Sequence, residues 1–275
     1  MKKTSRKQRI ERLIKYLPDL TEAQIIWLER IAYQFTRPKT FYRNPAEKLI
    51  STDLLLDDFG DALRIHHCFS DEPFTKDKFE YVLVNVFKFY GIVAGKSPIN
   101  NPGADVSINN ETFSLKTQAD SKLRTDFINI HKYMELGKGQ WSDKVKHLKG
   151  LTQQFLKHLS NYDRVLVLRN IGKPLPANPF WKYELVEIPK SLLMEVENGE
   201  FEMTTDSIQM PKPGFCRVRD KKTNALKYVL YFDGGSERKL KINNIDKRLC
   251  TVHATWEFII KELDEEQIQK DKTKS

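Results

Sequence analysis

The chain has 275 residues with 46 Lys or Arg and 37 Asp or Glu, which gives a formal net charge of +9 and a pI near 9.2. This excess favours polyanionic partners, and it is steepest in the first fifteen residues, where seven Lys or Arg face a single acid. No apolar run approaches the roughly 20 residues that cross a bilayer, so we expect no membrane contact and a cytoplasmic location. Three widely separated cysteines indicate neither a disulfide framework nor a zinc site.

The N-terminal region is mostly helical in pattern. Thr21 and Gln24 have the spacing of a capping box, and one apolar face continues from there to the stop at Arg37-Pro38. That face consists of Ile25, Leu28, Ala32 and Phe35. We expect residues 1–70 to form a helical lobe that serves dimerisation, clamps DNA or simply supports the core.

A further helix is predicted at residues 75–90. Thr75 is placed to cap it, and Glu80 lies early in the helix beside its apolar face. The apolar stripe consists of Phe79, Val82, Leu83, Val86, Phe87 and Tyr90. A short strand is expected directly afterwards, at residues 91–94.

Residues 103–118 predict a tight hairpin. Asn109-Asn110 is its turn, because asparagine tolerates the left-handed backbone that two-residue hairpin turns require. Folding about this pair places Asp105 opposite Ser114, and alternation along the strand puts Lys116 and Gln118 on the same face. The other face, expected in the core, carries Val106, Ile108, Phe113 and Leu115. Any half-exposed hairpin alternates in this way, but a carboxylate beside a lysine can also hold a divalent cation and orient a water.

The spacing from Asp105 to the Ser-Leu-Lys tripeptide at residues 114–116 resembles the motif of the PD-(D/E)XK nuclease superfamily. In that motif an aspartate on one strand is followed, on the next, by an acid, one residue and a lysine. Two positions depart from it: Ala104 replaces the usual proline, and Ser114 replaces the second acid. The resemblance implies an α/β (α+β) fold with a restriction-endonuclease-like core, in which helices flank a mixed central sheet.

The resemblance also implies how the hairpin would work. Asp105, the carbonyl of Leu115 and one further acid would hold Mg²⁺, while Lys116 would orient or help to deprotonate the attacking water. Ser114 would bind a metal-coordinated water, and Gln118 would contact phosphate or water.

The further acid has several candidates. Glu80 is the first, because the helix before the catalytic strands of this superfamily often brings a glutamate toward the metal; the alternative is a solvated acid favoured by the helix dipole. Asp126 and Glu135, on a possible helix over residues 123–136, are the other choices. Glu111 is disfavoured, because the hairpin register turns it away from the aspartate.

The remaining elements follow the order of such a core. An amphipathic helix is predicted at residues 144–159, a buried strand at 164–168 and another strand at 181–188. We assign residues 71–200 to the catalytic core and 201–275 to a basic β-rich lobe, unless the whole chain is one compact domain. The basic residues expected to contact DNA, unless they are only solvated, are Arg217, Arg219, Arg238, Lys239 and Lys241.

Together these features predict a type II restriction endonuclease, a Mg²⁺-dependent hydrolase of double-stranded DNA from a bacterium or archaeon. A palindromic target would favour a homodimer. No GxxxxGK[ST] loop is present, so no nucleotide cofactor is expected. The alternatives are a repair or junction-cleaving nuclease with the same core, and a non-catalytic DNA-binding protein in which Asp105 and Lys116 form an ion pair.

Overall fold

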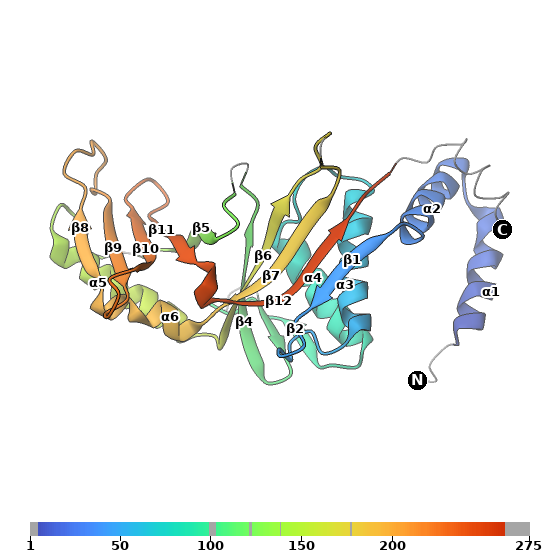
Figure 1. Cartoon of the computed structure of the whole chain (residues 1–275), viewed down its shortest axis with the longest axis horizontal. Coiled ribbons are helices and arrows are strands. Elements are labelled where there is room, and N and C mark those ends of the chain that lie inside the picture. Colours follow the sequence, from blue (N-terminus) through green and yellow to red (C-terminus); the bar gives the residue numbers. More distant parts are fainter. Residues whose placement is uncertain (1–4, 99–102, 121–122, 138, 177, 262–275) are drawn as a thin grey trace.

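The computed structural model describes residues 5–98, 103–120, 123–137, 139–176 and 178–261. Over these residues the chain forms two β-sheets that lie along the length of the molecule, with two helices projecting at one end (Figure 1). Helices cover the sheets, and strands from both halves of the chain enter the larger sheet. The predicted mixed α/β architecture is confirmed.

The larger sheet has seven strands in the order β1-β12-β7-β6-β4-β3-β2. Their bounds are β1 Lys39–Arg43, β2 Ala94–Lys96, β3 Val106–Ile108, β4 Glu111–Gln118, β6 Arg164–Gly172, β7 Trp181–Ile188 and β12 Thr251–Phe258. β4 and β6 pair in parallel and the other neighbours are antiparallel, so the sheet is mixed, as predicted. β6 and β7 are almost wholly buried, as expected of strands covered on both faces.

Helices α3 (Asp53–His67) and α4 (Lys76–Phe89) cover one face of this sheet. Their apolar side chains, among them Phe59, Phe79 and Leu83, pack against side chains of β3, β4, β7 and β12. The indole N–H of Trp256 on β12 also donates to the carbonyl of Leu56, at 2.9 Å. Thr75 precedes α4 as predicted, although its side chain makes no capping hydrogen bond.

The smaller sheet has five antiparallel strands in the order β5-β11-β10-β9-β8. Its bounds are β5 Phe127–Glu135, β8 Glu200–Met203, β9 Gly214–Arg219, β10 Leu226–Asp233 and β11 Lys239–Asp246. The helices α5 (Val145–Leu159) and α6 (Lys190–Met194) share a core with its inner face and with the second face of the larger sheet. Three 3-10 turns complete the structure: Leu17–Asp19, Glu195–Asn198 and Lys247–Leu249.

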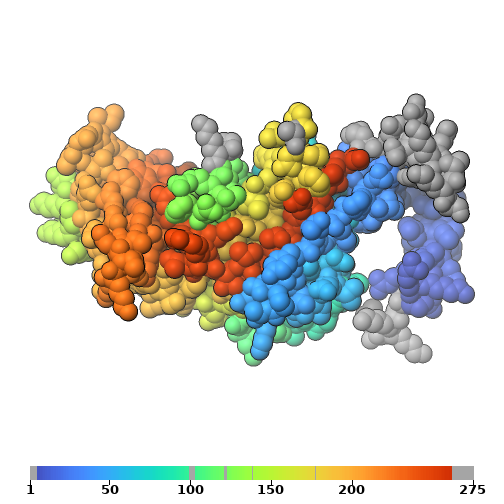
Figure 2. Space-filling view, viewed as in Figure 1, coloured from blue at the N-terminus to red at the C-terminus, as the bar shows by residue number. Residues whose placement is uncertain are grey.

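Helices α1 (Arg6–Tyr16) and α2 (Glu22–Phe35) project from the end opposite the smaller sheet (Figures 1 and 2). The predicted capping box of Thr21 and Gln24 is present. No residue of α1 is buried, and in α2 only Gln34 is, through hydrogen bonds between its amide and the backbone of Lys261. The apolar face of α2 is therefore largely exposed in this chain.

Two predicted elements are wrong. Residues 123–136 do not form a helix: residues 127–135 are strand β5, in which Ile128, Ile130 and Tyr133 face the core. The short strand lies at residues 94–96 and not at 91–94, because the chain turns at Gly91, which has φ of 76°. The pattern also missed β1, which joins β12 within a region expected to be helical.

Candidate active site

The hairpin of β3 and β4 forms in the predicted register. Val106 pairs with Phe113, and the N–H of Asp105 donates to the carbonyl of Phe113 at 2.8 Å, which sets Asp105 opposite Ser114. Asn109 occupies the turn with a φ of 52°. The apolar face is buried against α3 and α4, as expected. The polar face lies on the side of the core that α5 and α6 share with the smaller sheet. The hairpin itself is near the middle of the molecule (Figure 1).

The carboxylate of Asp105 is held by the neighbouring strand and by α4. Its Oδ2 accepts hydrogen bonds from the N–H of Leu115 at 2.6 Å and from the hydroxyl of Ser114 at 3.4 Å. Its Oδ1 is 2.6 Å from Nζ of Lys76. Since the N–H and C=O of one strand residue point to the same side, the carbonyl of Leu115 also faces the Asp105 side of β4.

Glu80 meets the same cation. Its Oε1 lies 3.5 Å from Nζ of Lys76, and its Oε2 lies 2.9 Å from Nζ of Lys96 on β2. Only 11% of its side chain is exposed, so it is not the solvated first-turn acid of the alternative interpretation. Asp105 and Glu80 thus converge on one ammonium group.

The other acids considered from the sequence lie elsewhere. Asp126 is exposed, and Glu135 is 64% exposed and ion-paired with Lys132 on the same strand. Glu111 is paired with Arg164 at the start of β6, at 3.1 Å. Of the four acids, only Glu80 shares a partner with Asp105 in the described structure.

Lys116 occupies the same face of β4 and is half-buried. Burial lowers its pKa to about 8, an effect that Asp105 opposes and Lys76 reinforces. Its Nζ lies 5.0 Å from the ring centre of Tyr133, and it makes no hydrogen bond or ion pair with any residue that the structure describes. This lysine is therefore unusually easy to deprotonate.

Two buried tyrosines, Tyr133 and Tyr162, and His158 lie in this part of the structure, and the sequence did not point to them. The hydroxyls of Tyr133 on β5 and Tyr162 after α5 are 2.5 Å apart. Burial raises the pKa of both tyrosines, and it lowers that of His158 to about 4, with Lys116 contributing. Tyr133 and Tyr162 thus form a pair of buried hydroxyls, with the ring of Tyr133 beside Lys116.

Gln118 is buried at the end of β4, and both ends of its amide are engaged. Its oxygen accepts from Nε of Arg169 at 2.8 Å, and its nitrogen donates to Asp120 at 2.9 Å. Both of these partners are protein groups, and the contact of Gln118 with phosphate or water stays a prediction.

The basic residues of the C-terminal part lie on the smaller sheet, and most of them are paired with acids. Arg217 and Arg219 on β9 pair with Glu202 and Glu200, whereas Lys239 and Lys241 on β11 pair with Glu237 and Asp233. Arg238, in the turn before β11, lies over the ring of Trp141. Their side chains remain about one-third exposed in the four ion pairs, so they form a mixed-charge surface.

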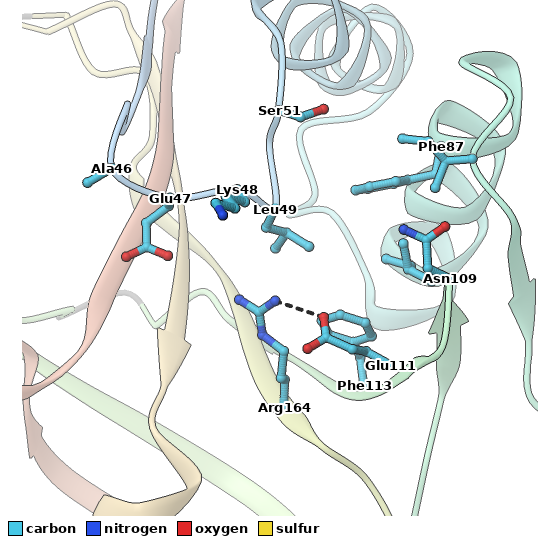
Figure 3. Close-up of a pocket in the computed structure, with 12 residues that line it drawn as sticks. Ala46, Glu47, Lys48, Leu49, Ser51, Phe87, Asn109, Glu111, Phe113 and Arg164 are labelled. Carbon is cyan, nitrogen blue, oxygen red and sulfur yellow. Dashed lines mark hydrogen bonds and ion pairs between the residues drawn. The ribbon is translucent and has the colours of Figure 1, made fainter.

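A cavity of about 450 Å³ lies beside the hairpin turn (Figure 3). Phe87, Ile108 and Phe113 are among its lining residues, with Asn109 and the ion pair of Arg164 and Glu111 nearby. None of the residues that converge on Lys76 lines it, so the polar cluster and not this cavity is the candidate active site.

Within the described residues, no cluster of three or more His, Cys, Asp or Glu side chains is arranged to hold a metal ion. The cluster offers two carboxylates and a backbone carbonyl, with lysines around them. In the same part of the chain no helix is long and apolar enough to span a membrane.

Comparison with known proteins identifies the class. The sequence model of the SmaI family, described as type II site-specific deoxyribonuclease, matches residues 13–258. The type II restriction enzyme SmaI of Serratia marcescens is 39% identical over 227 residues, which cover 82% of this chain and 87% of that enzyme. The chain is therefore a restriction endonuclease, which is a hydrolase. It belongs to the SmaI family of type II site-specific deoxyribonucleases, and the predicted class is confirmed.

A solved restriction endonuclease in complex with substrate DNA also aligns with the chain. The match covers 72% of this chain and 77% of that one, at 10% identity and a TM-score of 0.28. A similarity at this level carries no argument about the fold or the DNA-binding mode. The family assignment depends on the sequence matches alone.

Proposed function

We propose that this restriction endonuclease hydrolyses double-stranded DNA at a short site with Mg²⁺, through a variant PD-(D/E)XK centre built from Asp105, Glu80 and Lys116. The observation that carries the proposal is the convergence of two mostly buried carboxylates on one ammonium group, beside a half-buried lysine with a lowered pKa. Buried like charges are costly, so such an arrangement is typical of functional sites.

The donors fit a magnesium ion. Mg²⁺ prefers oxygen ligands, usually one or two carboxylates completed by waters and substrate phosphate. Oδ1 of Asp105 and Oε1 of Glu80 face a common cation, and the carbonyl of Leu115 lies on the same side of β4 as Asp105. When bound, the metal would polarise the phosphodiester and lower the pKa of water. Glu80 thus supplies the acid that the motif lacks at Ser114.

The protein's own groups handle the proton and the geometry. With a pKa of about 8, Lys116 is partly neutral near neutral pH, so it can orient a water and accept its proton. Ser114 is completely buried and donates to Asp105, so it positions that carboxylate; its contact with a metal-coordinated water stays a prediction.

Substitution of the three acting residues tests this site. In Mg²⁺, wild type is expected to cut phage DNA into discrete fragments. Asp105→Asn, Glu80→Gln and Lys116→Met should each lower the cleavage rate by at least about 100-fold, as loss of a catalytic group does. The matched controls Glu111→Gln and Glu135→Gln should stay within about threefold of wild type.

Three results would contradict the proposal. If wild type produces no discrete fragments, the proposal of sequence-specific duplex cleavage is wrong. If Asp105→Asn or Lys116→Met cleaves DNA as fast as wild type, the assignment of that residue to the active site is wrong. Full cleavage by Glu80→Gln together with loss in Glu135→Gln would move the second metal ligand to β5.

We also propose that the active form is a homodimer. Two sites can cut both strands in one binding event, and the described residues of one chain supply a single Asp105 and Lys116 cluster. The exposed apolar residues of α1 and α2 support a second copy as the partner. They are Ile10, Leu13, Ile14, Ile26, Trp27 and Leu28. On the mixed-charge surface of the smaller sheet, DNA phosphates would have to compete with the acids for Arg217, Arg219, Lys239 and Lys241.

A further inference from the structure

Lys76 holds a particular place in the cluster. It is the first residue of α4, one helical turn before Glu80, and its ammonium reaches across to Asp105 on the neighbouring hairpin. Its side chain is 40% exposed, against 17% for Asp105 and 11% for Glu80. The ammonium therefore closes the solvent side of a site whose acids are mostly buried.

Each carboxylate has one oxygen fixed by other groups and one that faces Lys76. Oδ2 of Asp105 is held by the N–H of Leu115, and Oε2 of Glu80 is held by Lys96. Oδ1 and Oε1 are left to share Nζ of Lys76, at 2.6 and 3.5 Å. Without a positive charge between them, two carboxylates at this depth would repel each other, and one would tend to protonate.

The same two oxygens are the ones that a divalent cation would use. Mg²⁺ binds carboxylate oxygens at about 2.0–2.1 Å, so it cannot share them with an ammonium that also contacts both. A divalent charge would in addition repel the ammonium at close range. Because Lys76 is partly exposed and carries a flexible four-carbon chain, it can move into solvent without disturbing α4.

We infer that Lys76 is an internal counter-ion that gives up its place to the metal. In the metal-free enzyme its ammonium neutralises Asp105 and Glu80 and keeps the site assembled. When the metal binds, the Lys76 ammonium leaves these oxygens and turns toward solvent. There it can contact the negatively charged DNA backbone. This role rests on the proposed metal site and adds to it a residue that lies outside the hairpin motif.

Metal affinity measured without DNA tests the exchange. Mn²⁺ binding to the full chain would be followed by electron paramagnetic resonance and calorimetry, after removal of metal with a chelator. Lys76→Met should bind Mn²⁺ about tenfold more tightly than wild type, because no ammonium has to be displaced. Lys76→Arg, which restores the charge, should bring the affinity back toward the wild-type value.

Lys78→Met is the matched control. It removes the same charge from the same helix, but Lys78 contacts His66 at 3.2 Å and neither carboxylate. Its Mn²⁺ affinity should stay within about twofold of wild type. Thermal melting adds a second readout: Lys76→Met should melt lower than wild type when metal-free, and Mn²⁺ should raise its melting temperature by more.

The outcomes separate this inference from the function on which it rests. If Lys76→Met binds Mn²⁺ no more tightly than wild type or Lys78→Met, while Asp105→Asn binds it far more weakly, the exchange is wrong and the metal site stands. If Asp105→Asn binds Mn²⁺ as tightly as wild type, the metal site itself is wrong and the exchange falls with it.

Discussion

Charge balance around Asp105 is the main feature at the scale of single residues. Lys76 contacts the carboxylates of Asp105 and Glu80, and Lys96 contacts that of Glu80. Both carboxylates also raise the pKa of Lys116 through their charge. Three positive groups around two negative ones leave a surplus of one charge when all are ionised. This is the charge balance of the metal-free site; a bound divalent ion would make the site more positive, which suits a negatively charged phosphodiester.

His67, which lies away from this site, has a strongly lowered pKa. Its ring stacks on Trp181 with centres 3.5 Å apart, and its Nδ1 and Nε2 meet the carbonyl of Ser70 and the hydroxyl of Tyr183. The Tyr183 oxygen already accepts hydrogen bonds from the N–H of Phe74 and from Asn170, so its own hydrogen points at Nε2. A second proton on the ring has no acceptor there.

Stability should therefore fall on acidification. Burial lowers the pKa of His67 from 6.5 to about 3, so between these values the unfolded chain binds a proton that the folded chain does not. The contribution of His67 to the free energy of unfolding is fully present above pH 6.5, and it is lost at roughly 1.4 kcal/mol per pH unit below that value. Urea unfolding at pH 7.5, 6 and 5 measures this dependence. A variant His67→Gln should show a shallower fall, and an equal slope in both proteins would contradict the assignment.

At the scale of elements, Arg169 joins the two sheets. It is completely buried on β6, pairs with Glu184 on β7 and bonds to Gln118 on β4. Its guanidinium also donates to the carbonyls of Arg124, Thr125 and Phe127, which lead into β5. One side chain thus fixes the start of β5, the strand that brings Tyr133 to Lys116.

Removing this guanidinium should be costly. Arg169→Met leaves Glu184 buried with Lys247 as its remaining cation, at 3.1 Å, and leaves several carbonyls without a donor. Breaking a buried pair from one side typically costs about 3–5 kcal/mol. Urea unfolding should show that loss, and Arg169→Met combined with Glu184→Leu should recover part of it. A loss below about 1 kcal/mol would mean that water replaces the guanidinium.

The elements also show what the sequence can reveal. The hairpin was predictable because an Asn-Asn turn and strict alternation fix one register, which brings Asp105, Ser114 and Lys116 together. β5 was mistaken for a helix because its pairing with β11 shifts register twice, which breaks the two-residue period. Lys76 and Tyr133 entered the site only through tertiary packing, which no local pattern encodes.

At the scale of the whole molecule, exposed apolar side chains are unevenly distributed over the surface. Its N-terminal end exposes a group of large apolar side chains on two helices that hardly contact the rest of the described chain (Figure 2). Large apolar side chains left exposed in such numbers are typical of protein interfaces. At this scale the sequence did indicate helices, but it could not show that their apolar face lacks a cover within the chain.

Charges placed on this face should therefore separate the proposed dimer. Sedimentation velocity of wild type should give about twice the chain mass of 32.3 kDa, and Leu13→Lys with Trp27→Lys should give the single-chain mass. Leu54→Lys is the matched control, because Leu54 is 64% exposed on α3, outside this face. A monomeric wild type, or variants that remain dimeric, would contradict the interface.

The pairing of β1 with β12 carries a consequence for how the enzyme comes into being. These strands join the two ends of the described chain, and the side chain of Asn44 reaches the carbonyl of Val252 across 208 residues of sequence. α3 packs on Trp256 of β12, and α4 with Glu80 packs on α3. Contacts so distant in sequence form slowly, and only once the last strand has been made. We expect cutting activity to lag behind synthesis, which gives the producing cell an interval before each new molecule can cleave DNA.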